Sequence, residues 1–243
     1  MHSTDKASRI AGALYLSTLP IALYCWSYIP GKLIVRGNAT ATADNILAHE
    51  TWFRASILGD LFGHVIFICL GLLLYRLLHD VNRMWALAML SFVLVSAAVG
   101  FLNALNSIAA VIFFRGADFL AVIDKAQRDA FAMFFIRLHG QGIVISEIFW
   151  GVWLFPFGLL VFRSGFLPRF LGAWLIVACF AWLVLSISEL LLPGSSSAIS
   201  TPLQFVTLGE MAIALWLLIK GAKVAPVRTA TSVDNSGMRA PQL

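Results

Sequence analysis

Six long apolar stretches run through this chain of 243 residues. A helix of about 20 residues crosses the hydrocarbon core of a bilayer, and each stretch is close to that length or longer. A backbone surrounded by lipid must satisfy its own hydrogen bonds, so we expect these stretches to be helices. The sequence therefore predicts an all-α, polytopic transmembrane bundle of six helices, at residues 10–29, 57–78, 84–114, 130–162, 170–192 and 202–219.

The composition supports a membrane protein. Hydrophobic residues make up 60% of the chain and charged residues 12%, whereas about 25% of a soluble domain is charged. The net charge of +5 does not indicate nucleic acid as a partner, because most Lys and Arg residues flank the apolar stretches. The sequence also lacks the H-E-x-x-H, G-x-S-x-G and Walker motifs of soluble enzymes. We expect residues 1–220 to form one six-helix transmembrane domain whose partner is the lipid bilayer.

The distribution of basic residues predicts the orientation in the membrane. Ten Lys and Arg residues lie on the side of the two termini and six on the other side, so both termini are expected in the cytoplasm. Residues 221–243 are polar and rich in small residues, which is typical of a disordered cytoplasmic tail. Trp26, Tyr28 and Trp52 are then expected at the outer membrane interface.

Two features concern the length and pairing of the spans. The third and fourth exceed the bilayer thickness, so we expect them to project outward as a hairpin closed by residues 115–129. The second, fourth and sixth spans have similar ends, at residues 71–76, 158–163 and 215–220. These ends suggest three tandem helical hairpins, although any such hairpin could end in leucine, an aromatic residue and a basic residue.

Four of the spans carry a carboxylate. A charged side chain at the centre of a bilayer costs about 2.5–3.5 kcal/mol, so carboxylates retained there are candidates for function. Glu189 is interpreted as a solvated helix end. Asp60 precedes Arg76 by sixteen residues and Glu147 precedes Arg163 by the same number, which predicts similar heights. The four carboxylates are Asp60, Glu147, Glu189 and Glu210.

Further polar residues surround these carboxylates in the predicted outer half of the membrane. The helical rise places His64 about 20–24 Å and Asp60 about 27–30 Å above the inner edge, with Glu210 near the middle. Asp60 and His64 share one helix face by their i,i+4 spacing. We expect no cofactor or resident metal. The predicted ligand-binding residues are Asp60, His64, Asn103, Asn106, His139, Gln141, Glu147 and Glu210.

This acidic layer, open to the outer side, predicts the binding of a small solute, cation or proton for transport or sensing. Two alternatives stay open. In an intramembrane metal-dependent hydrolase, His64, His139, Asp60 and Glu147 would hold Zn²⁺ with an open position for water. In a structural or partner-binding protein, the hairpin around residues 115–129 would form the contact and the carboxylates would pair helices.

Several segments resemble a family of bacterial membrane proteins. The most distinctive are EIFWGVWLFPFG at residues 147–158 and RSGFLPRFLG at 163–172, accompanied by LHGQG at 138–142. They resemble domain-of-unknown-function family 4386, and the resemblance covers the chain except its first few residues and its tail. It implies six spans in a bacterial plasma membrane, and it brings no assigned activity.

Overall fold

The computed structural model of the protein describes residues 3–192 and 196–222. Within these ranges all regular secondary structure is helical, which confirms the predicted fold class. Six helical stretches are long and apolar enough to cross a membrane, as expected. They are Asp5–Leu33, Glu50–Leu78, Arg83–Arg115, Lys125–Arg163, Arg169–Leu191 and Thr201–Ile219.

The first span is a helix with an irregular centre. It consists of α1 (Ser3–Ala22), the π-helix η1 (Leu23–Tyr28) and α2 (Ile29–Leu33). Pro20 near the end of α1 has no backbone N–H to donate, so it weakens the regular ladder just before the π-helical turns begin. Pro20 thus lies just before the irregular, π-helical part of the span.

A short helix follows in the connection between the first two predicted spans. This is α3 (Ala39–Ala48), and the side chain of Asn38 accepts a hydrogen bond from the backbone N–H of Ala41 at 2.9 Å. Such an N-cap satisfies one of the free N–H groups of the first turn. The next helix, α4 (Glu50–Leu78), crosses the molecule without interruption.

The third span is also continuous. α5 (Arg83–Arg115) has 33 residues, is capped by Asn82 and ends at Gly116, whose φ of 66° favours glycine. The turn η2 (Asp118–Leu120) follows it. The unusual length expected for this span is confirmed.

The fourth and the sixth spans are each broken into two helices. The fourth consists of α6 (Lys125–Val152) and α7 (Leu154–Arg163), and Pro156 cannot donate a hydrogen bond to the carbonyl of Val152. α8 (Arg169–Leu191) is regular.

The last span consists of α9 (Ser196–Thr207) and α10 (Gly209–Ile219), separated at Leu208. The indole Nε1 of Trp174 donates a hydrogen bond of 2.8 Å to the carbonyl of Val206 beside this break. The break is therefore stabilised by a residue of α8, since backbone carbonyls at membrane depth need a donor from the protein.

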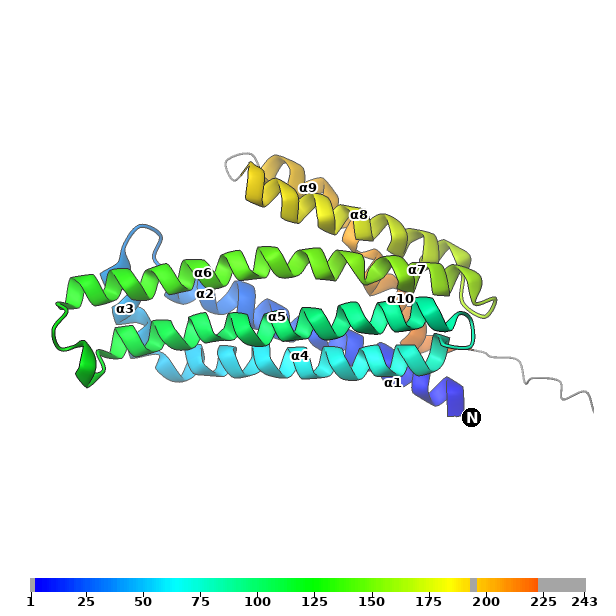
Figure 1. Ribbon diagram of the computed structural model, residues 1–243, viewed down its shortest axis with the longest axis horizontal. Helices are drawn as coiled ribbons and strands as arrows, with labels where there is room; N and C mark the ends of the chain where they lie inside the picture. Colours follow the sequence, from blue (N-terminus) through cyan, green and yellow to red (C-terminus); the bar gives the residue numbers. More distant parts are fainter. Residues whose placement is uncertain (1–2, 193–195, 223–243) are drawn as a thin grey trace, which may run out of the picture.

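The helices form a long bundle. In Figure 1, α4, α5 and α6 run side by side along the long axis, α8 and α9 are tilted relative to them, and α3 lies at the end opposite the N-terminus. α1 packs on α4, α5 on α6, and α8 on α9, as three hairpins would. α4 also packs on α5, and α7 on α8, so the packing is compatible with a tandem repeat without requiring one.

The described ends of the chain meet at one end of the bundle. The backbone N–H of Ala222 donates to Ser8 Oγ at 2.9 Å, which ties the end of the last span to the start of the first. Both ends on one side agree with six crossings. Gly221 and Ala222, which we expected to begin a disordered tail, are buried here, and residues 223–243 lie outside the described residues.

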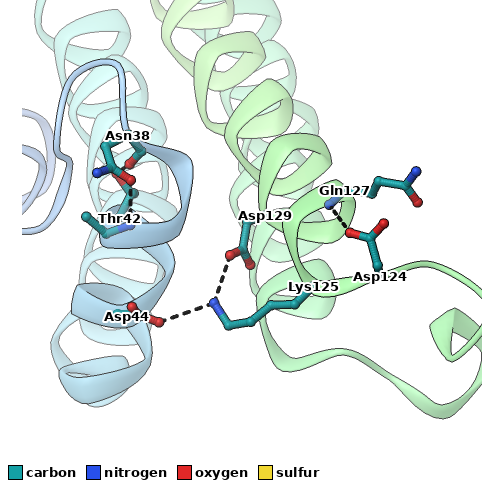
Figure 2. Close-up of polar contacts among 8 residues, drawn as sticks. Asn38, Thr42, Asp44, Asp124, Lys125, Gln127 and Asp129 are labelled. Carbon is teal, nitrogen blue, oxygen red and sulfur yellow. Dashed lines mark hydrogen bonds and ion pairs between the residues drawn. The ribbon is translucent and has the colours of Figure 1, made fainter.

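Charged residues gather at the opposite end, where α3 packs against α6. Figure 2 shows Lys125 reaching both Asp44 of α3, at 3.3 Å, and Asp129 of α6, at 2.8 Å. Arg115 pairs with Glu50 at 3.0 Å nearby. We refer to this region as the α3 end. It contains the hairpin around residues 115–129, whose height above the membrane stays a prediction.

Candidate functional site

A cavity of about 280 Å³ lies inside the bundle and is lined by α1, η1, α4, α6, α8 and α10, together with Trp153 at the break after α6. Its volume is close to the lower limit of known ligand pockets, about 300–1,000 Å³, and therefore suits a small molecule. Three of the predicted site residues line it: Asp60 and His64 from α4, and Glu210 from α10.

Glu210 lies at the second position of α10, directly after the break in the last span. The hydroxyl of Tyr15 on α1 donates a hydrogen bond to one carboxylate oxygen, and Trp182 Nε1 on α8 donates to the other at 2.6 Å. Both donors are neutral, and no Lys, Arg or His in the described ranges forms an ion pair with this carboxylate. Glu210 is thus held in place without being neutralised by a basic residue.

Asp60 has a different set of partners. Trp26 Nε1 donates a hydrogen bond to it at 3.0 Å, and His64 Nε2 lies 3.7 Å from the same carboxylate oxygen. The two α4 side chains are each 9% exposed and share one helix face, as their spacing predicts. Gly100 of α5 makes room for the imidazole, because a Cβ at this glycine would lie 2.0 Å from His64 Nε2.

A row of three indoles connects the two carboxylates. Trp26 and Trp150 are stacked with their ring centroids 4.9 Å apart, and Trp150 meets Trp182 edge to face at 5.5 Å. The first ring of the row donates to Asp60 and the last donates to Glu210. All three line the cavity, so its wall is aromatic between two acidic ends.

Three helices are irregular where they reach the cavity. The π-helix η1 carries Cys25 and Trp26, α6 ends one residue before Trp153, and α10 begins one residue before Glu210. π-helical turns occur frequently at functional sites, and broken transmembrane helices form the substrate sites of many transporters. These separate irregularities therefore meet at one cavity.

A second cavity of about 180 Å³ lies next to the first. Cys25, Trp26 and Asp60 line both cavities and therefore form the boundary between them. Ser56 and His139 line the second cavity, together with residues of α2 and the segment after it. The second cavity thus extends from Asp60 toward the α3 end.

Of two further predicted site residues, Asn103 connects α5 to α6 and Asn106 supports it from the same helix. Asn103 Nδ2 donates to the carbonyl of His139 at 2.9 Å, and Asn106 Nδ2 donates to Asn103 Oδ1 at 3.1 Å. A Cβ at Gly142 would lie 2.0 Å from Asn103 Oδ1, so this glycine makes room for the amide. The contacts correspond to helix pairing, while His139 also faces the second cavity.

The structure does not bring Gln141 or Glu147 to either cavity. Gln141 is exposed, and Glu147 lies close enough to Glu189 of α8 for the two carboxylates to interact. Glu147 has no hydrogen bond or ion pair with another residue that the structure describes. Asp60 and Glu147 each lie sixteen residues before an arginine at the end of their span, but they do not share a site.

The zinc alternative lacks its ligand set. Nowhere in residues 3–192 and 196–222 do three His, Cys, Asp or Glu side chains gather closely enough to hold a metal ion. His64 and Asp60 are close to each other, but His139 and Glu147 do not complete a cluster with them. The hydrolase mechanism that needs all four therefore finds no support in this geometry.

The aromatic members of the site were missed by the sequence analysis. Trp26 was expected at the outer interface, but its indole contacts Asp60 inside the bundle. Tyr15, Trp150 and Trp182 were not singled out. Their position along the spans was an available signal, because Trp and Tyr in membrane proteins concentrate at the interfaces and these residues lie away from the span ends.

Comparisons with known proteins agree with the resemblance. A protein from Archaeoglobus fulgidus described as an uncharacterized protein is 28% identical over 172 residues, which are 71% of this chain and 87% of the relative. No solved structure matches the chain. The family described as Domain of unknown function (DUF4386) matches residues 10–221, a range that includes every residue lining the first cavity. This chain therefore belongs to the DUF4386 family.

Proposed function

We propose that this protein binds a small cationic solute between Asp60 and Glu210, for transport or sensing at the membrane. One observation carries the proposal: two carboxylates from different helices face one cavity of ligand size, and no Lys or Arg lines it among the residues described. A cation in the cavity would supply the missing positive charge.

The energetic argument follows from the position of the carboxylates. An ionised side chain near the centre of a bilayer costs about 2.5–3.5 kcal/mol, and polar residues there are paired or functional. Asn103 and His139 show what pairing looks like in this bundle, since they bond two helices to each other. Glu210 also accepts hydrogen bonds from two other helices, but in addition it faces an open volume, which favours a ligand over a purely structural role.

The surroundings of the cavity favour transport over sensing. Irregular helices on three sides allow local rearrangement around a bound solute, as in transporters built on discontinuous helices. We propose that the protein lies in the bacterial plasma membrane, as its resemblance to the family implies, and that both termini face the cytoplasm, as the distribution of its basic residues indicates. In that orientation the second cavity leads from Asp60 toward the outside.

Thermal unfolding of the full chain in detergent micelles tests the proposal with a panel of small amines, amino acids and Na⁺. A ligand at 100 times its Kd stabilises the folded state by about 2.7 kcal/mol. We expect at least one cation to raise the Tm of the parent, and Glu210→Gln and Asp60→Asn to remove this response.

The matched control is Glu147→Gln, the same chemical change at a carboxylate outside the cavity. It should respond to the ligand like the parent. The proposal is wrong if no compound stabilises the parent. It is also wrong if Glu210→Gln and Asp60→Asn, folded by circular dichroism, keep the full response.

A further inference from the structure

We infer that the ligand is an organic ammonium ion, which places its charge beside the carboxylates and its carbon atoms against the indole rings. This inference rests on the proposed function and narrows it to one chemical class. It comes from the walls of the cavity, which are largely aromatic and aliphatic between the two acidic ends.

An inorganic cation fits these walls poorly. Ca²⁺ takes 6–8 oxygen ligands and Mg²⁺ keeps an octahedral shell, so both need several oxygen atoms close together. Here Asp60 and Glu210 lie at opposite ends of the indole row, and no metal-binding cluster is found in the described chain. The cavity provides two separate charges and an apolar surface between them.

An ammonium ion with alkyl groups matches that combination. Cations are attracted to the faces of aromatic rings, most strongly to Trp, by about 0.5–2 kcal/mol, and aromatic enclosures recognise quaternary ammonium groups. Trp26, Trp150 and Trp182 line the cavity, as do Tyr15 and Trp153. Carboxylates at both ends add the Coulomb attraction that rings alone do not provide.

The rings are fixed before any ligand binds. The indole N–H of Trp26 is held by Asp60 and that of Trp182 by Glu210, while Trp150 packs between the two rings. Rigid binding groups lose little conformational freedom on binding, which favours affinity. The carboxylates therefore have two roles: they orient the aromatic wall and they attract the cation.

The same walls disfavour other ligand classes. An anion would meet two carboxylates and no Lys or Arg among the described lining residues. A neutral sugar would leave both charges uncompensated. The volume of about 280 Å³ is close to the lower limit of known ligand pockets, so the cavity suits compact ammonium ions better than long-chain amphiphiles.

Isothermal titration calorimetry of the full chain in micelles tests the ligand class with three pairs of compounds. Each pair joins an ammonium ion to an uncharged analogue of similar shape: choline with 3,3-dimethylbutan-1-ol, butylammonium with butan-1-ol, and benzylammonium with benzyl alcohol. We expect at least one ammonium ion to bind tenfold or more tightly than its analogue.

Variants of the aromatic wall complete the test. Trp150→Leu should weaken binding of that ammonium ion about two- to thirtyfold, which is the cation–π range expressed as a ratio of Kd values. Trp150→Phe, which keeps a ring, should lie between this variant and the parent. Trp85→Leu changes an indole of α5 outside the cavity and should bind like the parent.

The outcomes separate this inference from the proposed function. If Na⁺ stabilises the parent in a Glu210-dependent manner and all three ammonium ions fail, the proposed function holds and the ligand class is wrong. If no compound of either panel binds, both proposals fall. If an ammonium ion binds equally to parent, Trp150→Leu and Glu210→Gln, it binds outside the cavity and the inference is overturned.

Discussion

Gly12 lies where α1 crosses the backbone of α10. A Cβ at this position would be 2.4 Å from the backbone N of Leu218, 2.7 Å from the carbonyl O of Ala214 and 2.9 Å from Leu218 Cα. None of these atoms belongs to a flexible side chain, so Gly12→Ala requires the two helices to move apart. Gly140 of α6 provides a matched control, because a Cβ there meets no atom within 4 Å.

The two substitutions should change stability in different directions. Replacing glycine by alanine inside a helix gains about 0.8–1.0 kcal/mol from helix propensity. Overpacking a tight contact costs about 1–3 kcal/mol, and this term applies only to Gly12→Ala. We expect Gly140→Ala to be about 1 kcal/mol more stable than the parent, and Gly12→Ala to lie about 1–3 kcal/mol below Gly140→Ala.

The same crossing positions the site. Tyr15 is one turn beyond Gly12 on α1, and Glu210 is one turn before Ala214 on α10, so separating the helices weakens the hydrogen bond between them. Gly12→Ala should therefore also reduce ligand binding. Reversible unfolding of both variants in identical micelles measures the difference. The reasoning is refuted if Gly12→Ala equals or exceeds Gly140→Ala in stability.

Two further predictions concern the ion pairs of Lys125 and the hydrogen bond from Trp182 to Glu210. The side chain of Asp129 is 2% exposed and pairs with Lys125, so Lys125→Met leaves a buried carboxylate without its partner and should destabilise the protein by about 1–3 kcal/mol. The side chain of Asp44, the other partner of Lys125, is 64% exposed, so Asp44→Asn should cost less than about 1 kcal/mol. Trp182→Phe removes one hydrogen-bond donor from Glu210, and should lower the free energy of unfolding by about 0.6–1.7 kcal/mol and weaken ligand binding, as unfolding and calorimetry would measure.

The number of spans and the fold class could be predicted from the sequence because length and hydropathy are local properties. The third span, predicted at residues 84–114, is α5 (Arg83–Arg115). Its ends carry local signals, since Asn82 caps the first turn and Gly116 adopts a left-handed conformation. Where such a signal was overlooked, as with Asn38 before α3, the helix was missed.

The helix breaks depend on distant residues. Pro156 gives a local cause for the break before α7, but the last span has no proline at Leu208. Its break is stabilised by the hydrogen bond from Trp174 to the carbonyl of Val206, and no pattern within the span reveals that partner. Since an unsatisfied carbonyl in lipid is costly, this donor from α8 stabilises a break that the sequence of the span itself does not explain.

Heights along the helices could be predicted only for straight, parallel spans. The helical rise placed Asp60 well above Glu210, yet both line one cavity. α8 and α9 are tilted relative to the long helices in Figure 1, and α10 begins as a new helix after the break at Leu208. The number of residues between Glu210 and the basic end of its span therefore does not measure the depth of Glu210 in the membrane. Glu147 lies sixteen residues before Arg163, as Asp60 does before Arg76, but this count does not show which way the side chain points. Its carboxylate lies near that of Glu189 rather than in the cavity.

The choice among the carboxylates depends on which of them an indole can reach. An unpaired polar group is costly in an apolar layer, so an indole N–H and a carboxylate at the same level stabilise each other. Nearness in sequence does not identify such pairs: Trp150 is three residues from Glu147, but the donors to Asp60 and Glu210 are Trp26 and Trp182, each from another helix. The two carboxylates of the site are therefore distinguished from Glu147 by contacts between helices, and a sequence that is apolar on all sides of each span does not encode those contacts locally.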